Sequence, residues 1–101
     1  MNYKVRYTSG AREDLRRLFT FLAERYHPTA TRARKTIAAS MKLLEEFPFT
    51  CRKAEDDSGN AFLRELLIPF GSAGYIVLFE IEDQSTVTIL AARHQREDDY
   101  H

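Results

Sequence analysis

The sequence predicts an α+β domain with the element order β-α-α-β-β-β, in which a mainly antiparallel sheet packs against an N-terminal helix hairpin. Three observations lead to this prediction. Residues 3–7 alternate apolar and basic side chains, as a strand with one buried face does. Residues 9–47 carry apolar side chains at helical spacing. Residues 62–92 contain three runs at the strand period of two, and the short links between them favour an antiparallel meander.

The composition is that of one compact domain spanning residues 1–101. With 44% hydrophobic residues, a chain of this length can bury a core without covalent or metal staples. Cys51 is the only cysteine, so no intrachain disulfide can form. No N-terminal segment resembles a signal peptide, and the longest apolar runs, 66–68 and 75–79, are far shorter than the roughly 20 residues of a membrane span. We therefore expect a cytoplasmic protein with no membrane contact.

The net charge of zero conceals a strong asymmetry along the chain. Residues 1–53 contain twelve Lys and Arg against five Asp and Glu, which gives plus seven. Residues 54–101 contain three against ten, which gives minus seven. One interpretation is a basic surface that meets nucleic acid or an acidic protein segment. The other is that the two halves neutralise each other within the fold, and the sequence leaves both open.

The first helix is predicted to follow the strand at residues 3–7 and to continue to about residue 26. Ser9 is suited to cap it, and Glu13 and Asp14 would lie in its first turn, where the helix dipole favours anions. The arc of apolar side chains is wide, so a second helix or a partner must cover its flank. The side chains in this arc are Ala11, Leu15, Leu18, Leu22 and Tyr26, with Phe19 and Phe21 on its two flanks.

The second helix is predicted to start near Pro28, which suits the first helical position, and to reach Phe47 before Pro48 stops it. Because the link at residues 26–29 is short, the two helices should form an antiparallel hairpin. The apolar residues that keep the helical period are Ala33, Ile37, Met41 and Leu44. The basic residues left mostly outside are Arg12, Arg16, Arg17, Arg32, Arg34 and Lys35.

The last third of the chain is predicted to form the meander, and its final strand is expected at the centre of the sheet. That strand has apolar residues on both faces, so both faces should be covered. In order, we expect a polar loop at 49–60, a strand at 62–68, a loop at 69–74, a strand at 75–81, a turn at 82–85 and the final strand at 86–92.

Directly after the final strand, the sequence changes from apolar to reactive side chains. Arginine can hold a phosphate, histidine can move a proton near neutral pH, and tyrosine can stack on a base. Catalysis, binding and a purely structural role all remain open. In the structural interpretation His94 bonds a backbone carbonyl, the arginines pair with residues 97–99, and these acidic residues form a solvated tail. The candidate side chains are Arg93, His94, Arg96 and Tyr100, with Arg64 and Tyr75 from the preceding strands.

We expect neither a metal nor another cofactor. His27, His94 and His101 have no metal-ligand spacing, and Cys51 stands alone. The chain also lacks a phosphate loop, a nucleophile elbow and a dinucleotide-binding fingerprint.

A series of short motifs follows along nearly the whole chain. They are the run Ser9–Leu15, Phe47-Pro48, Arg64-Glu65-Leu66, Pro69-Phe70-Gly71, Gly74-Tyr75 and Ala92-Arg93-His94-Gln95-Arg96. In this order and spacing they resemble the RelE/ParE family of bacterial toxins. The resemblance implies the toxin of a type II toxin–antitoxin pair with a β-α-α-β-β-β fold. It also implies a cognate antitoxin whose C-terminal segment wraps over the toxin and neutralises it.

The residue after Tyr75 separates two branches of this family. RelE-like toxins, which cut messenger RNA on the ribosome, usually carry an arginine there, whereas this chain has Ile76. An aliphatic side chain cannot clamp a phosphate or stabilise its developing charge. ParE-like toxins tend to lack that arginine and are associated with inhibition of DNA gyrase. The resemblance therefore implies a gyrase inhibitor that is not an enzyme.

Two alternatives stay open beside the gyrase inhibitor. The first is a ribosome-dependent endoribonuclease with His94 as acid or base, Arg93 and Arg96 as phosphate clamps, and Tyr100 for stacking or proton donation. The second is a harmless binding module that keeps only a partner interaction.

The resemblance also suggests where partners bind. We expect gyrase, or the ribosome and its messenger RNA, to contact the residues around the final strand. The exposed flank of the first helix at Arg17 and Phe21 should help receive the antitoxin in a hetero-oligomer. The expected target-binding residues are Arg64, Tyr75, Arg93, His94, Arg96 and Tyr100.

Overall fold

The computed structural model describes residues 2–55, 59–97 and 100 of the chain. The predicted loop residues 56–58 and the predicted acidic tail at 98–99 lie outside this part. The elements in chain order are β1 (Lys4–Tyr7), α1 (Ser9–Arg25), α2 (His27–Leu43), the 3-10 helix η1 (Pro48–Thr50), β2 (Arg52–Lys53), β3 (Leu63–Phe70), β4 (Ala73–Ile81) and β5 (Thr86–His94).

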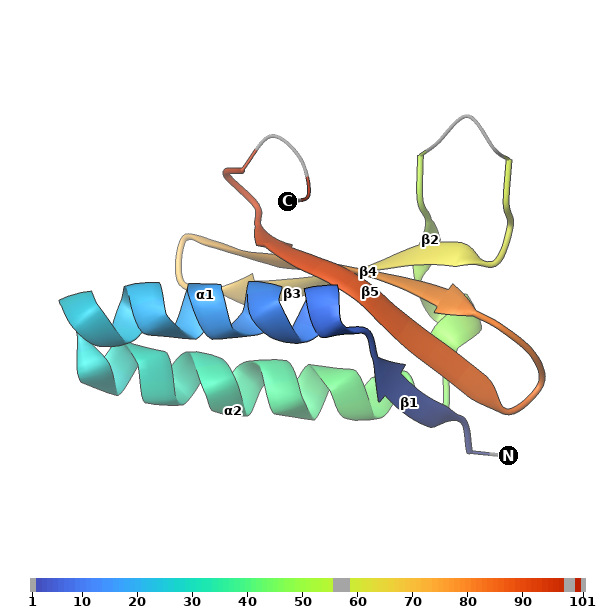
Figure 1. Cartoon of the computed structure of the whole chain (residues 1–101), viewed down its shortest axis with the longest axis horizontal. Coiled ribbons are helices and arrows are strands. Elements are labelled where there is room, and N and C mark those ends of the chain that lie inside the picture. The colour runs from blue at the N-terminus through green and yellow to red at the C-terminus, as the bar shows by residue number, and fades with distance from the viewer. Residues whose placement is uncertain (1, 56–58, 98–99, 101) are drawn as a thin grey trace.

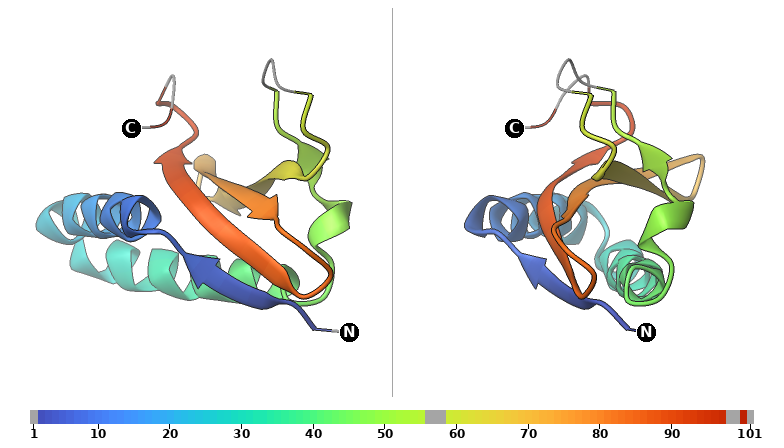
Figure 2. Two further views of the ribbon diagram at one scale, coloured as in Figure 1. Left: turned by 45° about the vertical axis from the view of Figure 1, so that its right-hand side comes forward. Right: turned by 90° about the vertical axis from the view of Figure 1, so that its right-hand side faces the viewer.

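The strands form one sheet in the order β1-β5-β4-β3-β2 (Figure 2). The β2, β3, β4 and β5 neighbours pair antiparallel, so the predicted meander is confirmed, and β1 joins β5 in parallel. A parallel pair needs a long connection, and here the chain between β1 and β5 contains both helices and the strands β2, β3 and β4. The expectation that the last strand is central was wrong, because β4 holds the middle position and β5 lies between β4 and β1.

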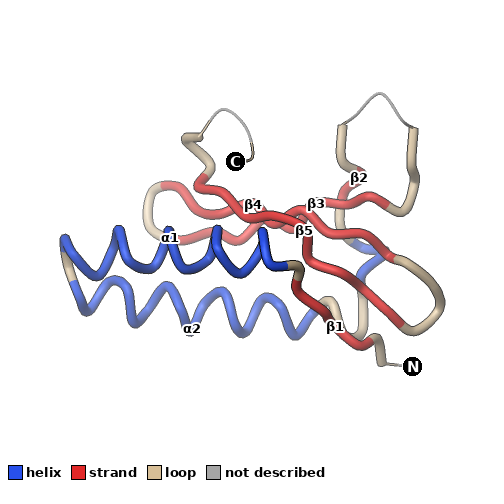
Figure 3. Tube along the Cα trace, in the orientation of Figure 1, coloured by secondary structure: helices blue, strands red, loops and turns tan. Residues whose placement is uncertain are grey.

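The two helices lie side by side on one face of the sheet, as predicted for an antiparallel hairpin (Figure 1). Figure 3 shows the same two layers along the Cα trace, with the helices below the strands. None of the described helices is long and apolar enough to cross a lipid bilayer.

Several element boundaries differ from the prediction. Thr8, not Ser9, caps α1, because its Oγ1 accepts the backbone N–H of Ala11 at 3.0 Å and the helix starts at Ser9. Helix α2 ends at Leu43 instead of Phe47, and a turn leads from there into η1. The predicted loop at 69–74 is mostly strand, because β3 and β4 remain paired up to a tight turn. Strand β2 was not predicted, since its two residues are both exposed and show no apolar pattern.

Beyond the last residue of β1, the N-terminal end of α1 makes the hydrogen bonds to β5. The last pair of the β1–β5 ladder involves Ile89, and beyond it the Thr8 hydroxyl donates to the carbonyl of Leu90 at 3.2 Å. A carboxylate oxygen of Asp14 then accepts the backbone N–H of Ala92 at 3.0 Å. Asp14 is buried, so its role is to satisfy the edge of β5 and not, as predicted, to lie in the first turn as a dipole-stabilising acid.

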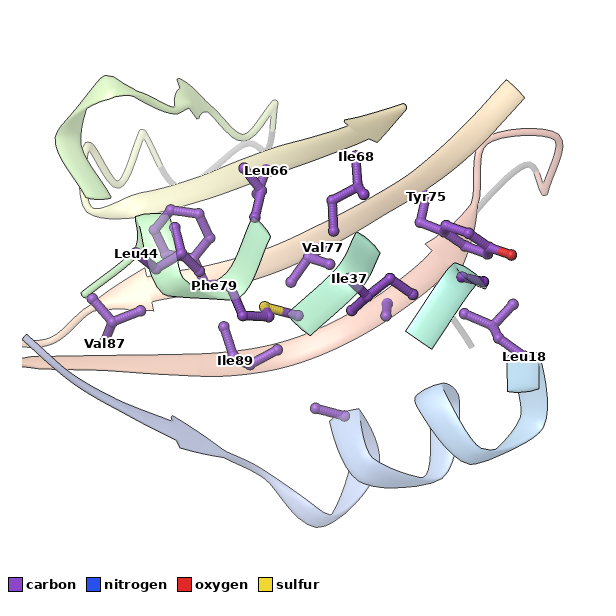
Figure 4. Close-up of a cluster of buried hydrophobic side chains, with 14 of the residues drawn as sticks. Leu18, Ile37, Leu44, Leu66, Ile68, Tyr75, Val77, Phe79, Val87 and Ile89 are labelled. Atoms are coloured by element: carbon purple, nitrogen blue, oxygen red, sulfur yellow. The ribbon is translucent and has the colours of Figure 1, made fainter. Parts of the chain in front are cut away.

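The hydrophobic core lies between the helix hairpin and the sheet (Figure 4). The predicted helical stripes are largely confirmed, because most of their inner residues are buried. The side chains labelled in Figure 4 come from both layers and pack together: Leu18, Ile37 and Leu44 from the helical region, and Leu66, Ile68, Tyr75, Val77, Phe79, Val87 and Ile89 from the strands. This core fixes the helix hairpin on the sheet and so positions the surfaces described next.

Candidate functional site

A groove of about 490 Å³ lies where α1 passes over the sheet, at the end where β3 finishes, β4 begins and β5 finishes. We call it the C-terminal groove. Its walls are mainly apolar and aromatic, with charged groups at one side. The residues that line it are Arg17, Leu18, Phe21 and Leu22 from α1, Phe70 and Tyr75 from β3 and β4, and His94, Arg96 and Glu97 from the end of β5 and the following turn.

Three rings form the sheet side of the C-terminal groove. Tyr75 lies opposite His94 in the β4–β5 ladder, and the two rings meet edge to face with centroids 5.6 Å apart. The ring of Phe70 also packs against that of Tyr75, with centroids 6.1 Å apart. Burial raises the pKa of Tyr75, so its hydroxyl stays protonated at neutral pH and can donate a hydrogen bond. The rings offer a preformed surface to an apolar or aromatic group.

The turn after β5 fixes His94 and Arg96. The backbone N–H of Gln95 donates to the carbonyl of Gly74 at 2.9 Å, which anchors the turn to β4. The backbone N–H of Arg96 donates to Nδ1 of His94 at 3.1 Å, so the imidazole proton is on Nε2. In the structural interpretation of the sequence His94 donated to a carbonyl, whereas here it accepts from an N–H. The guanidinium of Arg96 reaches Ser72 Oγ at 3.4 Å.

An ion pair closes the charged side of the groove. The guanidinium of Arg17 donates to both carboxylate oxygens of Glu97, at 3.0 and 3.3 Å. The two side chains are only partly exposed, at 37% and 24%. Phe21, one turn further along α1, is 52% exposed at the groove. The expected antitoxin-binding residues, Arg17 and Phe21, therefore line the same groove as three of the expected target-binding residues.

Arg93 and Tyr100 lie on the opposite face of the sheet. Arg93 pairs with Ile76, and the strand period of two turns both away from the neighbouring Tyr75–His94 face. The Arg93 guanidinium lies 5.2 Å from the centre of the Tyr100 ring. The Tyr100 hydroxyl donates to the carboxylate of Glu65. Burial, together with this hydrogen bond, raises the pKa of Tyr100 far above that of an ordinary phenol.

Arg64 lies in a third place, far along the sheet from His94. It pairs with Phe79 in the β3–β4 ladder, whereas His94 pairs with Tyr75 at the other end of β4. Its guanidinium donates to the carbonyls of Ala61 at 2.8 Å and Cys51 at 2.9 Å. These bonds tie the segment before β2 to the start of β3, which is a structural role. The six predicted target-binding residues are thus divided among three locations.

Sequence reasoning missed four groove residues, namely Leu18, Leu22, Phe70 and Glu97, of which Leu18 was assigned to the core stripe. Leu22 was assigned to the core stripe, although it is only partly buried. Phe70 was placed in the predicted loop at 69–74, whereas it is the last residue of β3. Strand β2 pairs with Arg64 and Glu65, and the part of β3 that follows, including Pro69, lies at an edge of the sheet. Proline is tolerated in an edge strand, so Pro69 is compatible with a strand that continues to Phe70.

A second groove of about 560 Å³ lies along the helix hairpin. Its floor is apolar and its rim carries arginines, two of which lie over aromatic rings: Arg12 at 5.9 Å from Tyr7 and Arg34 at 5.3 Å from Phe19. The sequence predicted that a second helix or a partner must cover the apolar flank of α1 that lines this groove. Within the described residues, no three His, Cys, Asp or Glu side chains gather in a way that could hold a metal ion.

Comparison with known proteins adds two findings. The family model for the ParE toxin of the type II toxin–antitoxin system parDE matches residues 5–99. Among solved structures, a chain of the chromosomal ParDE toxin–antitoxin system from P. aeruginosa is similar, with a TM-score of 0.72 and 16% identity over 91% of this chain and 95% of that one. At this identity, the similarity concerns the fold. A search of curated proteins gives no match.

Proposed function

Because this chain belongs to the ParE toxin family of type II toxin–antitoxin systems, we propose that it binds and inhibits DNA gyrase in the cytoplasm and that a cognate antitoxin neutralises it. It performs no covalent chemistry of its own in this proposal. Toxin and antitoxin form a hetero-oligomer while the toxin is inactive.

The separation of the reactive side chains is the observation that carries this proposal. His94 and Arg96 line the C-terminal groove, whereas Arg93 and Tyr100 lie on the other face of the sheet. An acid, a base and a phosphate clamp must all come within hydrogen-bond reach of one reacting group. Ile76, which follows Tyr75, is buried and offers no clamp. This arrangement favours binding over cleavage of a phosphodiester.

The chemistry of the C-terminal groove suits a protein partner. Tyrosine, other aromatic residues and arginine are the side chains that contribute most to protein interfaces. The groove combines Phe21, Tyr75 and Arg96 with an apolar wall. We assign the contact with gyrase to this groove.

The same groove supports a mechanism of neutralisation. Arg17 and Phe21, the residues expected to receive the antitoxin, line it together with Tyr75, His94 and Arg96. An antitoxin segment seated on the α1 side of the groove covers the residues that gyrase needs. Neutralisation is then direct competition for one surface, with no change of toxin conformation.

Induced expression without antitoxin tests the target. Inhibition of gyrase predicts filamentous cells, DNA damage and gyrase trapped on cleaved DNA. If translation stops first while supercoiling stays intact, the proposal is wrong. If a folded chain causes no toxicity, the third possibility from the sequence, a harmless binding module, takes its place.

Two groove variants test the antitoxin contact. Arg17→Ala and Phe21→Ala should each weaken binding of the cognate antitoxin about tenfold or more, as loss of an interface hot spot does. Arg32→Ala is the matched control, since Arg32 is exposed on α2 and lies outside the lining of this groove. Calorimetry measures the affinity of each variant for the antitoxin. Equal affinities of all three variants would contradict this contact.

The second candidate function is a ribosome-dependent endoribonuclease. It is supported by His94 and Arg96, which share the groove and have the chemistry to move a proton and hold a phosphate. Mapping of transcript ends after induction tests it, since new cuts within codons are expected. Separate alanine variants of Arg93 and His94 distinguish catalysis from binding. If the chain is a nuclease, one of the two variants should lose nearly all activity, whereas on a binding surface each variant should weaken the contact by a partial, graded amount.

A further inference from the structure

A third cavity, of about 250 Å³, lies at the end of β4 remote from the C-terminal groove. Tyr75 near the start of β4 lines the groove, whereas Ile81 at its end lines this cavity. At about 3.3 Å per strand residue the two are roughly 20 Å apart. Tyr3, Phe49 and Phe62 form walls of this cavity, and we call it the aromatic pocket.

The backbone holds these aromatic residues in place. Phe49 and Phe62 meet edge to face, with ring centroids 6.2 Å apart and planes at 77°. The N–H of Ile81 donates to the carbonyl of Phe62 at 2.9 Å. The carbonyl of Phe49 accepts from Arg64 at 3.2 Å. Although they are fixed in this way, Phe49 and Phe62 are 49% and 51% exposed, so large parts of both rings face solvent.

Two carboxylates complete the aromatic pocket. Glu82 and Asp83 follow β4 directly and line it. Asp83 accepts hydrogen bonds from the N–H of Ser85 at 2.8 Å and from its hydroxyl at 3.1 Å, and these bonds lower the pKa of Asp83. Asp83 is therefore negatively charged at neutral pH.

Within the described part of the chain, Arg6 and Arg64 contact residues of the pocket. Arg6 approaches Glu82 only to 4.0 Å, with both side chains exposed, so this ion pair is weak and solvated. The guanidinium of Arg64 lies 5.4 Å from the centre of the Phe49 ring. The ring of Phe49 thus already takes part in a cation–π contact within this chain, while Phe62 and Tyr3 have no such contact among the described residues.

We propose that the aromatic pocket binds an arginine side chain from a basic segment of a partner protein. Aromatic faces attract a cation, and carboxylates at the rim pair with it. A guanidinium fits this combination better than an ammonium, because it is planar, stacks on rings and makes two parallel bonds to a carboxylate. This surface is separate from the C-terminal groove, so it serves a contact beyond the proposed inhibition of gyrase.

Peptide titration followed by NMR tests the proposal on the full chain. The probe is the blocked tripeptide Ac-Gly-Arg-Gly-NH2, and the matched control replaces arginine by citrulline, its neutral isostere. The arginine peptide should shift the backbone amides of Phe62, Ile81 and Asp83 and saturate. The citrulline peptide should bind at least about fivefold more weakly, because both the cation–π contact and the ion pair are lost.

Variants locate the site. Phe62→Leu keeps an apolar side chain but removes the ring, and Asp83→Asn keeps an acceptor for Ser85 but removes the charge. Each should weaken arginine binding about fivefold. Phe21→Leu, in the C-terminal groove, is the control and should leave it unchanged. Thermal unfolding verifies that each variant is folded.

Three results would overturn the proposal: equal binding of the citrulline peptide, binding unaffected by Phe62→Leu, or no saturable shift at all. Concentration-dependent shifts of the same amides without peptide would also contradict it, since a second copy of the chain would then fill the pocket. Gyrase inhibition is measured separately, so failure here leaves the proposed function untouched.

Discussion

Asp14 shows how one buried side chain connects helix α1 to the sheet. Its carboxylate accepts the N–H of Ala92, at a point on β5 that β1 does not reach. A buried N–H without a partner costs free energy, so this hydrogen bond removes a penalty as well as joining two elements. The position of α1, and with it one wall of the C-terminal groove, depends on such contacts.

Asp14→Ala should lower the free energy of unfolding by about 1–3 kcal/mol, because the N–H of Ala92 is left buried without an acceptor. Asp14→Asn keeps an oxygen acceptor and should retain most of the stability. The control is Glu13→Ala, which removes an exposed side chain that pairs with Arg16. Urea denaturation measures all three, and an Asp14→Ala midpoint equal to that of Glu13→Ala would contradict the role assigned to Asp14.

Tyr100 provides a prediction about pH. Burial raises its pKa in the folded chain, whereas in the unfolded chain it ionises near the ordinary value of 10.0. The folded state therefore binds more protons above this pH, and the stability from Tyr100, fully present below about pH 10, is lost as pH rises further. Tyr7 and Tyr75 act in the same direction.

Tyr100→Phe should reduce the loss of stability between about pH 9 and about pH 11 without abolishing it, because Tyr7 and Tyr75, whose pKa values are also raised, remain. Urea midpoints across this range measure the slope. Tyr26→Phe is the control, since Tyr26 is 62% exposed. If the slopes of the two variants agree, Tyr100 does not titrate as described.

At the scale of elements, the close pairing of β3 and β4 sets the shape of the groove. A Cβ atom added at Gly74 would lie 2.2 Å from the carbonyl oxygen of Ile68, which no real contact allows. Glycine at this position lets β4 approach β3 where Phe70 and Tyr75 line the groove.

Gly74→Ala should force the two strands apart and destabilise the fold by about 1–3 kcal/mol or more. It should also shift the NMR signals of Tyr75 and His94. Gly10→Ala is a matched control, because a Cβ there meets nothing closer than 3.8 Å and alanine favours a helix. Equal unfolding midpoints for the two variants would show that the β3–β4 approach is not tight.

The sequence predicted the elements better than their pairing. Apolar periodicity located both helices and the three long strands, because burial on one face leaves a pattern. The parallel pairing of β1 with β5 left no such pattern, because it joins strands that are separated by both helices and three other strands. Helix α2 was predicted too long, because the turn at its end continues the apolar spacing. Strand β2 is too short and too polar to leave a pattern.

The candidate site was only partly predictable for a related reason. Arg93 and His94 were treated as one cluster because the strand was predicted to end at Ala92, whereas β5 continues to His94. With the strand extended, its period of two would have separated these side chains to opposite faces. That α1 covers the same end of the sheet is a tertiary fact, so the shared groove of Arg17, Phe21 and His94 had no signal in the sequence.

At the scale of the whole molecule, part of the charge asymmetry cancels within the fold. Arg17–Glu97, Arg52–Glu65 and Arg6–Glu82 each join the basic first half to the acidic second half. The arginines around the second groove, which lies along the helix hairpin, do not take part in these three ion pairs, and they form a basic rim over its apolar floor. Both interpretations of the charge pattern therefore apply, each to a different part of the surface.

The two ends of the sheet present different surfaces. The C-terminal groove combines rings with arginines, whereas the aromatic pocket combines rings with carboxylates. Partners of opposite charge character are expected at the two ends, and the rigid strand β4 keeps the sites apart.

Inhibition of gyrase through the C-terminal groove can be measured in a cleavage assay with purified gyrase and supercoiled plasmid. We predict that the chain makes linear DNA accumulate and that His94→Ala and Arg96→Ala each reduce this effect about tenfold. Arg32→Ala, outside the groove, should act as the unchanged chain does. No accumulation of linear DNA at a saturating amount of folded chain would contradict the proposed inhibition of gyrase.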